Sequence, residues 1–441
     1  MTLGKILRDM GVVGAGGGGF PTHVKVTNKY EVVIGNGAEC EPLLYSDKYI
    51  MENESEEIVR GLELVMQSTG AKKGFIALKR KNLATDGRMK KSIAEKKNIS
   101  LFFLNDYYPV GDEFLLVQEI TGKVIPEGGI PPDIGCLVNN VETLKNISRA
   151  EKGIAVTRRT LTCVGEVKRP SIVVAQIGTP FREIIDLCKP TIEEFVVMVG
   201  GPMMGKVVSD LDTPVTKTTT GILVLSKDHP LILKKAMKIE YIIKQSKAAC
   251  CQCSYCTELC PRYLLGHELY PHKIMRQISY GLDVPHEVIQ NAFLCSECGL
   301  CEVFACPMEL SPRIINQKIK ENLISAGYQP EFSTGIEKWR ETQKDRKIPS
   351  SRIKNRLRLD KYEEVIRGSS LGVVETNSSQ VEILLKQHAG VSSHPVVKIG
   401  EWVNEGDLIA EIPPGELGAR LHASIKGKVI YLDEQRIIIQ K

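Results

Sequence analysis

Two short cysteine runs constrain the fold of this chain more than any other feature. The first run reads C-x2-C-x2-C-x3-C-P and the second reads C-x2-C-x2-C-x4-C-P. Their cysteines are Cys250, Cys253, Cys256 and Cys260, and Cys295, Cys298, Cys301 and Cys306. Three closely spaced thiolates can hold one face of a 4Fe-4S cube, while a fourth, followed by proline, comes from elsewhere. We therefore predict two 4Fe-4S clusters in a helical segment that covers residues 240–328.

Other uses of cysteine fit this pattern less well. A secreted disulfide scaffold is short, whereas nine of the thirteen cysteines lie between Cys250 and Cys306 of a 441-residue chain. Zinc ribbons also use four cysteines, but as two C-x2-C pairs that lie far apart. In two-cluster ferredoxins the cysteine before proline serves the other cluster. We therefore expect Cys306 to complete the first cluster and Cys260 the second, and regular spacing favours Cys250 over its neighbour Cys251 as a ligand.

The N-terminal third alternates between strand and helix patterns. The strands are YEVVIG, KGFIALK and ISLFFL, and an amphipathic helix from Ser55 to a stop at Gly70 separates the first two. This order predicts a mainly parallel sheet with ligand-binding loops at the strand ends. We assign residues 1–150 to a Rossmann-like α/β domain.

Three loops in this domain carry groups suited to a phosphate and a flavin ring. They read GAGGGGFPTHVK, IGNGAECEP and VNNVETL. Free N–H groups of a glycine-rich turn can bind phosphate, and Lys25 adds positive charge. Asn139 and Asn140 offer both donors and acceptors, as the edge of a flavin ring requires. Each loop alone is a weak signal.

Together, in this order, the loops resemble the flavin-bearing NADH-oxidising subunit of respiratory complex I and the C subunit of the Rnf complex. Those families share GxGGxGFPTxxK, then N-A-x-E-x-E-P, then NNVET. The complex I version has arginine after its first glycine, where this chain has Ala15. The resemblance implies an FMN site built from Gly14, Gly16, Gly17, Gly19, Lys25, Asn36, Glu39, Asn139, Asn140 and Thr143. The stretch YPVGDEFLL is similar to the loop that places an acidic residue beside the nicotinamide, which makes Glu113 the candidate catalytic residue and Glu41 an alternative.

The remaining segments predict an α/β multidomain protein. Short strands around the helix FREIIDLC make residues 151–228 similar to a β-grasp module. Residues 329–380 are polar and basic, which favours a surface linker over a nucleic-acid-binding arm because interleaved aromatic residues are lacking. Residues 381–441 match an all-β barrel-sandwich hybrid of the biotinyl or lipoyl type. Its hairpin PPGELGA has no lysine, so we predict no biotin or lipoyl group and a structural or docking role.

The order of these domains extends the resemblance nearly from end to end. In the Rnf protein the barrel sandwich comes at the N-terminus. The final order here, the C-x4-C spacing and the ending GELGARLHASIKGKV resemble the corrin (cobalamin) reductase of propanediol utilisation. That family passes electrons from NADH through FMN and two 4Fe-4S clusters to cobalamin. The resemblance therefore implies an oxidoreductase that reduces cob(III)alamin or cob(II)alamin and works with an adenosyltransferase inside a bacterial microcompartment.

An electron-transfer adaptor without corrin activity is the alternative. It would deliver electrons from NADH to a ferredoxin or a reductase partner, and the motifs are common to both functions. The D-x-H-x-x-G motif for holding cobalamin through a histidine is missing, so we expect cobalamin as a transient substrate or on the partner.

Charge and hydropathy set the expected location. The net charge of +5 gives no strong electrostatic reason to expect a nucleic-acid partner. The chain lacks an apolar run of transmembrane length, and MTLGKILRDMGVV lacks the apolar core of a signal peptide. We expect a cytoplasmic protein with no transmembrane segment.

Overall fold

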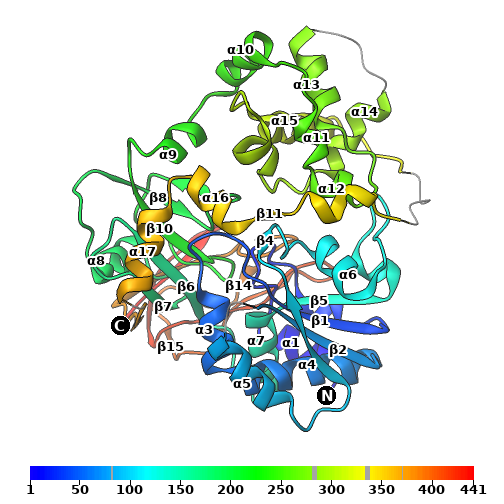
Figure 1. The fold of residues 1–441 in the computed structure, drawn as a ribbon. Coiled ribbons are helices and arrows are strands. Elements are labelled where there is room, and N and C mark those ends of the chain that lie inside the picture. The colour runs from blue at the N-terminus through cyan, green and yellow to red at the C-terminus, as the bar shows by residue number, and fades with distance from the viewer. Residues whose placement is uncertain (81–82, 281–285, 333–337, 370) are drawn as a thin grey trace.

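The fold is taken from a computed structural model, which describes residues 1–80, 83–280, 286–332, 338–369 and 371–441. The cysteine-rich helices lie at one end of the molecule, and two α/β layers and a small all-β unit make up the rest (Figure 1). The fold class expected from the sequence, a mixed α/β multidomain protein, is confirmed. No helix within the described ranges is long and apolar enough to cross a bilayer.

The first layer is a four-stranded parallel sheet in the order β3-β2-β1-β5. Its elements are β1 (Val32–Gly37), β2 (Lys73–Lys79), β3 (Ile99–Leu104), β5 (Cys136–Asn140), α3 (Ser46–Asn53), α4 (Ser55–Thr69), α5 (Leu83–Ile93), α6 (Glu113–Thr121) and α7 (Val141–Glu151). Parallel sheets need cover on their faces, which explains the apolar strands and the amphipathic helices between them. Helix α4 ends at Gly70, whose φ of 74° suits glycine. The parallel sheet predicted from the sequence is present.

Two short helices precede this sheet, and the glycine-rich loop lies between them. They are α1 (Leu3–Asp9) and α2 (Thr22–Lys25). The hydroxyl of Thr2 accepts a hydrogen bond from the backbone N–H of Lys5 and caps α1.

The second layer is a six-stranded sheet in the order β12-β7-β6-β10-β8-β9. Its elements are β6 (Arg158–Gly165), β7 (Ser171–Gln176), α8 (Phe181–Cys188), β8 (Phe195–Val199), β9 (Lys206–Val208), β10 (Gly221–Ser226) and β12 (Gly372–Glu375). The edge strand β12 pairs parallel with β7, although about 200 residues separate them in sequence. The chain therefore returns to this sheet after it leaves the cysteine-rich region.

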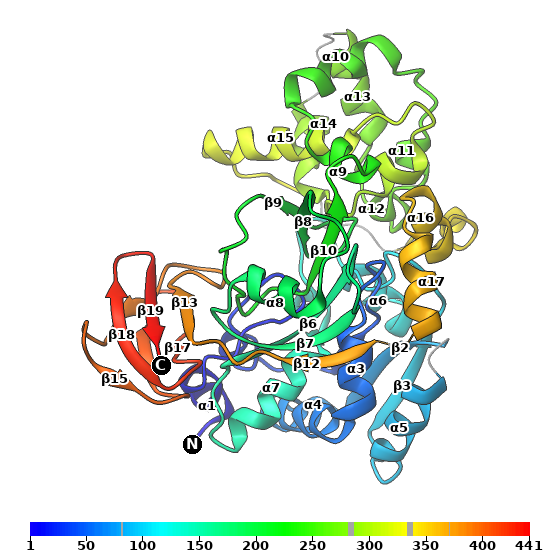
Figure 2. The same cartoon turned by 90° about the vertical axis from the view of Figure 1, so that its left-hand side faces the viewer.

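Residues 329–380 differ from the surface linker expected from composition. They contain β11 (Ile348–Pro349), α16 (Ser350–Arg356), α17 (Asp360–Ser369) and β12. Ile353 and Leu359 are fully buried, and Tyr362 is nearly so. Basic residues between these apolar positions dominate the composition of the segment. The segment nevertheless packs against the body of the molecule (Figure 2).

The cysteine-rich region is helical. It contains α10 (Ile239–Ala249), α11 (Tyr255–Glu258), α12 (Pro261–Leu264), α13 (Pro271–Tyr280), α14 (His286–Gln290), η2 (Asn291–Leu294), η3 (Cys301–Ala305) and α15 (Pro312–Ser325), and α9 (Pro230–Lys235) leads into it. The extra residue of the C-x4-C spacing forms a π-helical turn, in which the N–H of Cys306 donates to the carbonyl of Cys301 over 3.1 Å. The extra residue therefore makes a local bulge in the second cysteine run.

The C-terminal unit contains two small sheets, in the orders β13-β19-β18-β15 and β14-β16-β17. Its strands are β13 (Gln380–Leu384), β14 (His394–Pro395), β15 (Trp402–Val403), β16 (Leu408–Glu411), β17 (Leu421–His422), β18 (Gly427–Leu432) and β19 (Arg436–Gln440). The unit lies on the side of the molecule that holds the N-terminus (Figure 2). An ion pair of 2.6 Å joins Arg420 to Asp9 at the end of α1.

Candidate flavin site and cluster-binding cysteines

The glycine-rich loop is a closed turn with one open side. The N–H of Gly14 donates to the carbonyl of Phe20 over 2.9 Å, and the N–H of Gly19 donates back to Gly14 over 3.2 Å. Gly17 and Gly18 are exposed, and a Cβ atom on either would meet nothing within 4 Å. The loop therefore leaves a bare stretch of backbone facing open space, as an FMN phosphate or ring would require.

Polar side chains line the adjoining ends of β1 and β5. Asn36 pairs in register with Asn140, and Gly35 with Asn139. Asn140 caps α7 by accepting the N–H of Glu142 over 2.8 Å. A Cβ atom on Gly16 would lie 3.5 Å from the Cβ of Asn140, so the loop approaches this strand end closely.

Asn139 gives a direct test of whether these residues fit a flavin. Its side chain is only 3% exposed, and its amide Nδ2 has no hydrogen-bond partner among the residues that the structure describes. A buried amide without a partner is unfavourable, so an orphaned donor of this kind is typical of a ligand site. The donor set and the open glycine loop therefore both fit FMN.

Three further predicted residues reach the same region. The ammonium of Lys25 donates to the carbonyl of Val138 over 3.2 Å, and the hydroxyl of Thr143 accepts the N–H of Ala15 over 2.9 Å. Glu113 is exposed at the start of α6. Protein packed around its carboxyl raises the Glu113 pKa, and the nearby charge of Lys25 opposes that rise.

The two glutamates of the second loop are bonded to backbone groups. The carboxylate of Glu39 accepts the N–H groups of Asp47 and Lys48 at the start of α3, over 2.9 and 3.1 Å. That of Glu41 accepts the N–H groups of Met203 and Met204, both over 2.9 Å. Burial raises the pKa of both carboxyls. Glu113 differs from these two glutamates. Among the hydrogen bonds of the described residues, its carboxylate accepts none from a backbone N–H group.

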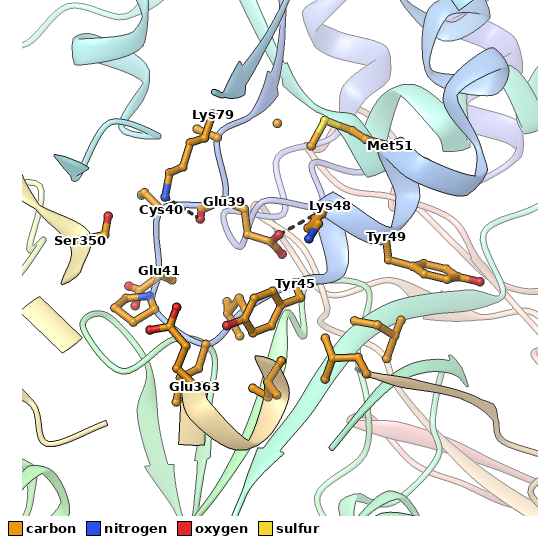
Figure 3. Close-up of a pocket in the computed structure, with 18 of the residues that line it drawn as sticks. Glu39, Cys40, Glu41, Tyr45, Lys48, Tyr49, Met51, Lys79, Ser350 and Glu363 are labelled. Carbon is orange, nitrogen blue, oxygen red and sulfur yellow. Dashed lines mark hydrogen bonds between the residues drawn. The ribbon is translucent and has the colours of Figure 1, made fainter. Parts of the chain in front are cut away.

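A cavity of about 600 Å³ lies beside this loop (Figure 3). Its walls come from the segment 37–45, from α3 and from α16 and α17, and the glycine-rich loop does not contribute. Glu39, Tyr45 and Lys79 project into it, and burial raises the pKa of the Cys40 thiol to about 12. This cavity therefore adjoins the flavin region on its β2 side.

Arg159 is a residue of this region that sequence reasoning missed. It lies on β6, is 3% exposed, and donates to the carbonyl of Ala15 over 2.7 Å and to that of Thr219 over 2.6 Å. Its guanidinium also pairs with the fully buried Glu142. A cation thus reaches Ala15 from another part of the chain, and no local motif signals it.

The eight cysteines lie in two groups, and each group contains the last cysteine of the other run. Cys250, Cys253, Cys256 and Cys306 line one hollow, and the exposed Cys251 lies at its edge. In the other group, Cys260 packs with Cys295 and adjoins Cys298. Cys301 belongs to the same run as these two cysteines. The structure therefore brings Cys306 to the first run and Cys260 to the second, as ligand exchange requires.

The group that contains Cys260 adjoins the flavin region. The hydroxyl of Tyr108 donates to the carbonyl of Cys298 over 2.6 Å. Arg262, two residues after Cys260, makes a bidentate ion pair with Asp112 over 2.7 and 3.0 Å. Asp112 directly precedes Glu113 and caps α6. We call this set of four the inner group, and the set that contains Cys306 the outer group.

Comparison with known proteins assigns families to three parts of the chain. Residues 7–149 match the Nuo51 FMN-binding domain, residues 249–311 a 4Fe-4S dicluster domain, and residues 363–441 the RnfC barrel sandwich hybrid domain. These ranges contain the open glycine loop, the two cysteine groups and the C-terminal pair of sheets, respectively.

Similarity over the whole chain decides the family. Cobalamin reductase PduS of Citrobacter freundii is 40% identical over 440 residues, which cover 99% of this chain and 96% of that protein. The chain belongs to the PduS family. PduS of Salmonella typhimurium is also 40% identical, over 98% of this chain and 95% of that protein. The C subunit of the Na⁺-translocating ferredoxin:NAD⁺ oxidoreductase complex of Acetobacterium woodii is 36% identical over 59% of this chain and 58% of that protein.

Membership of the PduS family and the matched domains establish the general chemistry. The chain is an electron-transferring oxidoreductase with FMN and two 4Fe-4S clusters as cofactors. The sequence predicted the cofactors and the enzyme class correctly.

Proposed function

We propose that this protein is an NADH-dependent cobalamin reductase, which passes electrons from NADH through FMN and two 4Fe-4S clusters to cobalamin. The observation that carries the proposal is the 40% identity to cobalamin reductase PduS along almost the whole length of both chains. The contacts from the flavin region through Asp112 and Arg262 to the inner cysteine group support a continuous route for electrons.

The proposal includes finer domain assignments. Residues 1–150 form a Rossmann-like FMN domain, 151–228 a β-grasp module, 240–328 a ferredoxin-like two-cluster domain and 381–441 the barrel sandwich. Residues 329–380 connect the last two through α16, α17 and β12. The parallel sheet, the helical cysteine region and the pair of C-terminal sheets support these divisions.

Each part of the flavin region has a proposed role. Gly14 and Gly19 close the loop, the N–H groups of Gly16 and Gly17 and the charge of Lys25 bind phosphate, and the free amide of Asn139 bonds the ring edge. The remaining contacts come from Asn36, Glu39, Asn140 and Thr143. Glu113 orients the nicotinamide of NADH. Conversion of a two-electron hydride donor into single electrons is the chemistry that bound FMN supplies.

The cysteine groups give the route a direction. The inner group, Cys260, Cys295, Cys298 and Cys301, holds the cluster that receives electrons first. The outer group, Cys250, Cys253, Cys256 and Cys306, holds the cluster that passes them out. The contact of Tyr108 with Cys298 and the exposure of Cys251 support this order.

The proposed setting is cytoplasmic, within a bacterial microcompartment. There the enzyme works with an adenosyltransferase, and cobalamin is a transient substrate or is held by that partner. A second candidate is an adaptor that delivers electrons from NADH to a ferredoxin or a reductase partner, and the 36% identity to part of a ferredoxin:NAD⁺ oxidoreductase complex favours it as the alternative.

Anaerobic reconstitution separates the two functions. Iron and flavin are counted, and NADH oxidation is followed with cob(II)alamin trapped by an adenosyltransferase, and separately with a ferredoxin. We expect adenosylcobalamin to form. Bleaching of the clusters by NADH without adenosylcobalamin would leave only the adaptor function. Cys253→Ser should remove one cluster and leave reduction of the flavin by NADH intact.

A further inference from the structure

The barrel sandwich touches the glycine-rich loop directly. The N–H of Ala389, in the loop after β13, donates to the carbonyl of Gly19 over 3.0 Å. A Cβ atom on Gly19 would lie 3.0 Å from Cγ2 of Thr218 and 3.1 Å from Cα of His388. The last glycine of the loop is thus enclosed between the turn before β10 and the barrel sandwich.

Lys217 joins the same three parts of the molecule. Its side chain is 3% exposed, and its ammonium donates to the carbonyl of Gly11 over 2.7 Å and to that of Arg420 over 2.8 Å. Its backbone N–H donates to Oε1 of Gln387 over 2.9 Å. Both acceptors of the ammonium are neutral carbonyl oxygens, so this buried cation is unlike the paired cations elsewhere in the core.

The start of the loop is held as tightly as its end. Gly11 has a φ of 65°, and a Cβ atom there would lie 2.4 Å from the carbonyl oxygen of Arg420. The guanidinium of Arg420 pairs with Asp9 and with Glu411, which fixes the segment just before β17 that carries this carbonyl. Gly11 and Gly19 are therefore anchored, while Gly17 and Gly18 between them stay open.

We propose that the barrel sandwich acts, through Lys217, as a clamp that holds the glycine-rich loop in the conformation that binds FMN. The inference rests on the proposed function only in that FMN binds at this loop. Glycine loses more backbone freedom on folding than any other residue, so a glycine-rich loop left free would have to be ordered when FMN binds. A loop ordered in advance binds more tightly because that loss has already occurred. Lys217 is a positioning residue that acts through the loop.

The test measures FMN affinity in the full chain with its clusters in place. FMN is removed and then titrated back, and the quenching of its fluorescence gives Kd. We expect Lys217→Met to raise Kd at least tenfold with unchanged iron content, and Lys217→Arg, which keeps N–H donors, to recover part of the loss. At saturating FMN, the visible circular dichroism of the bound flavin should be weaker in Lys217→Met, because the loop holds the ring less rigidly.

The matched control is Lys426→Met, the same change at an exposed lysine of the barrel sandwich. It should bind FMN with the wild-type Kd. A folded Lys217→Met variant with wild-type Kd and dichroism would overturn the clamp. If Lys217→Met also lost iron, Gly19→Ala would decide: a raised Kd with full iron content supports the clamp, and an unchanged Kd refutes it. Failure of the wild-type protein to bind FMN would contradict the proposed function instead.

Discussion

Glu113 combines an exposed position at the start of α6 with a perturbed carboxyl group. Protein packed around the carboxyl raises its pKa above the ordinary 4.5, and Lys25 opposes that rise. The carboxylate is therefore lost as the pH falls through a value above 4.5, and reduction of the flavin by NADH should fall with it.

Glu113→Gln should slow flavin reduction by NADH about ten- to a hundredfold at neutral pH, the effect of losing a charge-assisted hydrogen bond of about 1.5–3 kcal/mol. It should also abolish the acidic limb of the pH profile. Stopped-flow absorbance measures both. Glu31→Gln, on an exposed glutamate, is the control and should leave rate and profile unchanged. An unaltered profile in Glu113→Gln would exclude this role.

Lys217 should make stability depend on pH. Burial lowers its pKa from 10.5 to about 7, so the unfolded chain takes up the proton first, and this residue removes stability as the pH falls from about 10.5 to 7. His388 and His422 face it from the barrel sandwich, but their pKa values are lowered to about 4 and 3, so they stay neutral in this window. The guanidinium of Arg420 is paired.

Lys217→Met should therefore flatten the dependence of the free energy of unfolding on pH between 7 and 10, by up to about 1.4 kcal/mol per pH unit. Denaturant unfolding at several pH values measures the slope. Equal slopes for the variant and the wild-type protein would show that Lys217 titrates normally.

At the scale of the elements, helices α4 and α7 are packed so closely that a side chain larger than that of glycine does not fit between them at Gly61. A Cβ atom on Gly61 of α4 would lie 1.9 Å from the carbonyl oxygen of Leu144 on α7, which is backbone and cannot move aside. Gly61→Ala should therefore lower the free energy of unfolding by about 2–3 kcal/mol. Gly87 on α5 meets nothing within 4 Å, so Gly87→Ala should stabilise by about 0.5–1 kcal/mol. Denaturant unfolding of both variants tests the pair, and equal effects would contradict this packing.

The elements also show which features the sequence could predict. The parallel sheet follows from local patterns, because apolar strands and amphipathic helices alternate. The approach of Cys306 to the first cysteine run and of Cys260 to the second follows from the spacing read with the pattern of two-cluster ferredoxins. Arg159 and Lys217 could not be found in this way, since they reach Ala15 and Gly11 across 144 and 206 residues of sequence.

Composition misled for one segment, and one motif left the direction of its side chains open. The buried Ile353 and Leu359 stand among cations, so the segment that carries α16 and α17 read as a linker. The N-A-x-E-x-E-P motif identifies the two glutamates but does not show which way their side chains point. Backbone N–H groups at the start of α3 take up the carboxylate of Glu39, and Met203 and Met204 take up that of Glu41.

For the molecule as a whole, the two cysteine groups differ in their surroundings. Cys260 and its neighbours lie against the flavin region, whereas the exposed Cys251 lies at the edge of the outer group. A paramagnetic dysprosium complex in solution should therefore relax the electron-spin signal of the outer cluster more strongly than that of the inner cluster. Cys253→Ser and Cys298→Ser each remove one cluster and so assign the two signals. Equal relaxation of both signals would contradict the proposed direction of electron flow.

The ion pair of Arg420 with Asp9 ties the last domain to the first helix, and in Figure 2 the barrel sandwich lies beside the N-terminus. The position of the barrel sandwich in the amino-acid sequence therefore does not determine its position in the folded molecule. A rearrangement that moved its coding segment to another place in the reading frame would need a new connection but would leave this contact between the domains in place. The order of the domains along the chain can thus change while their arrangement in space is kept.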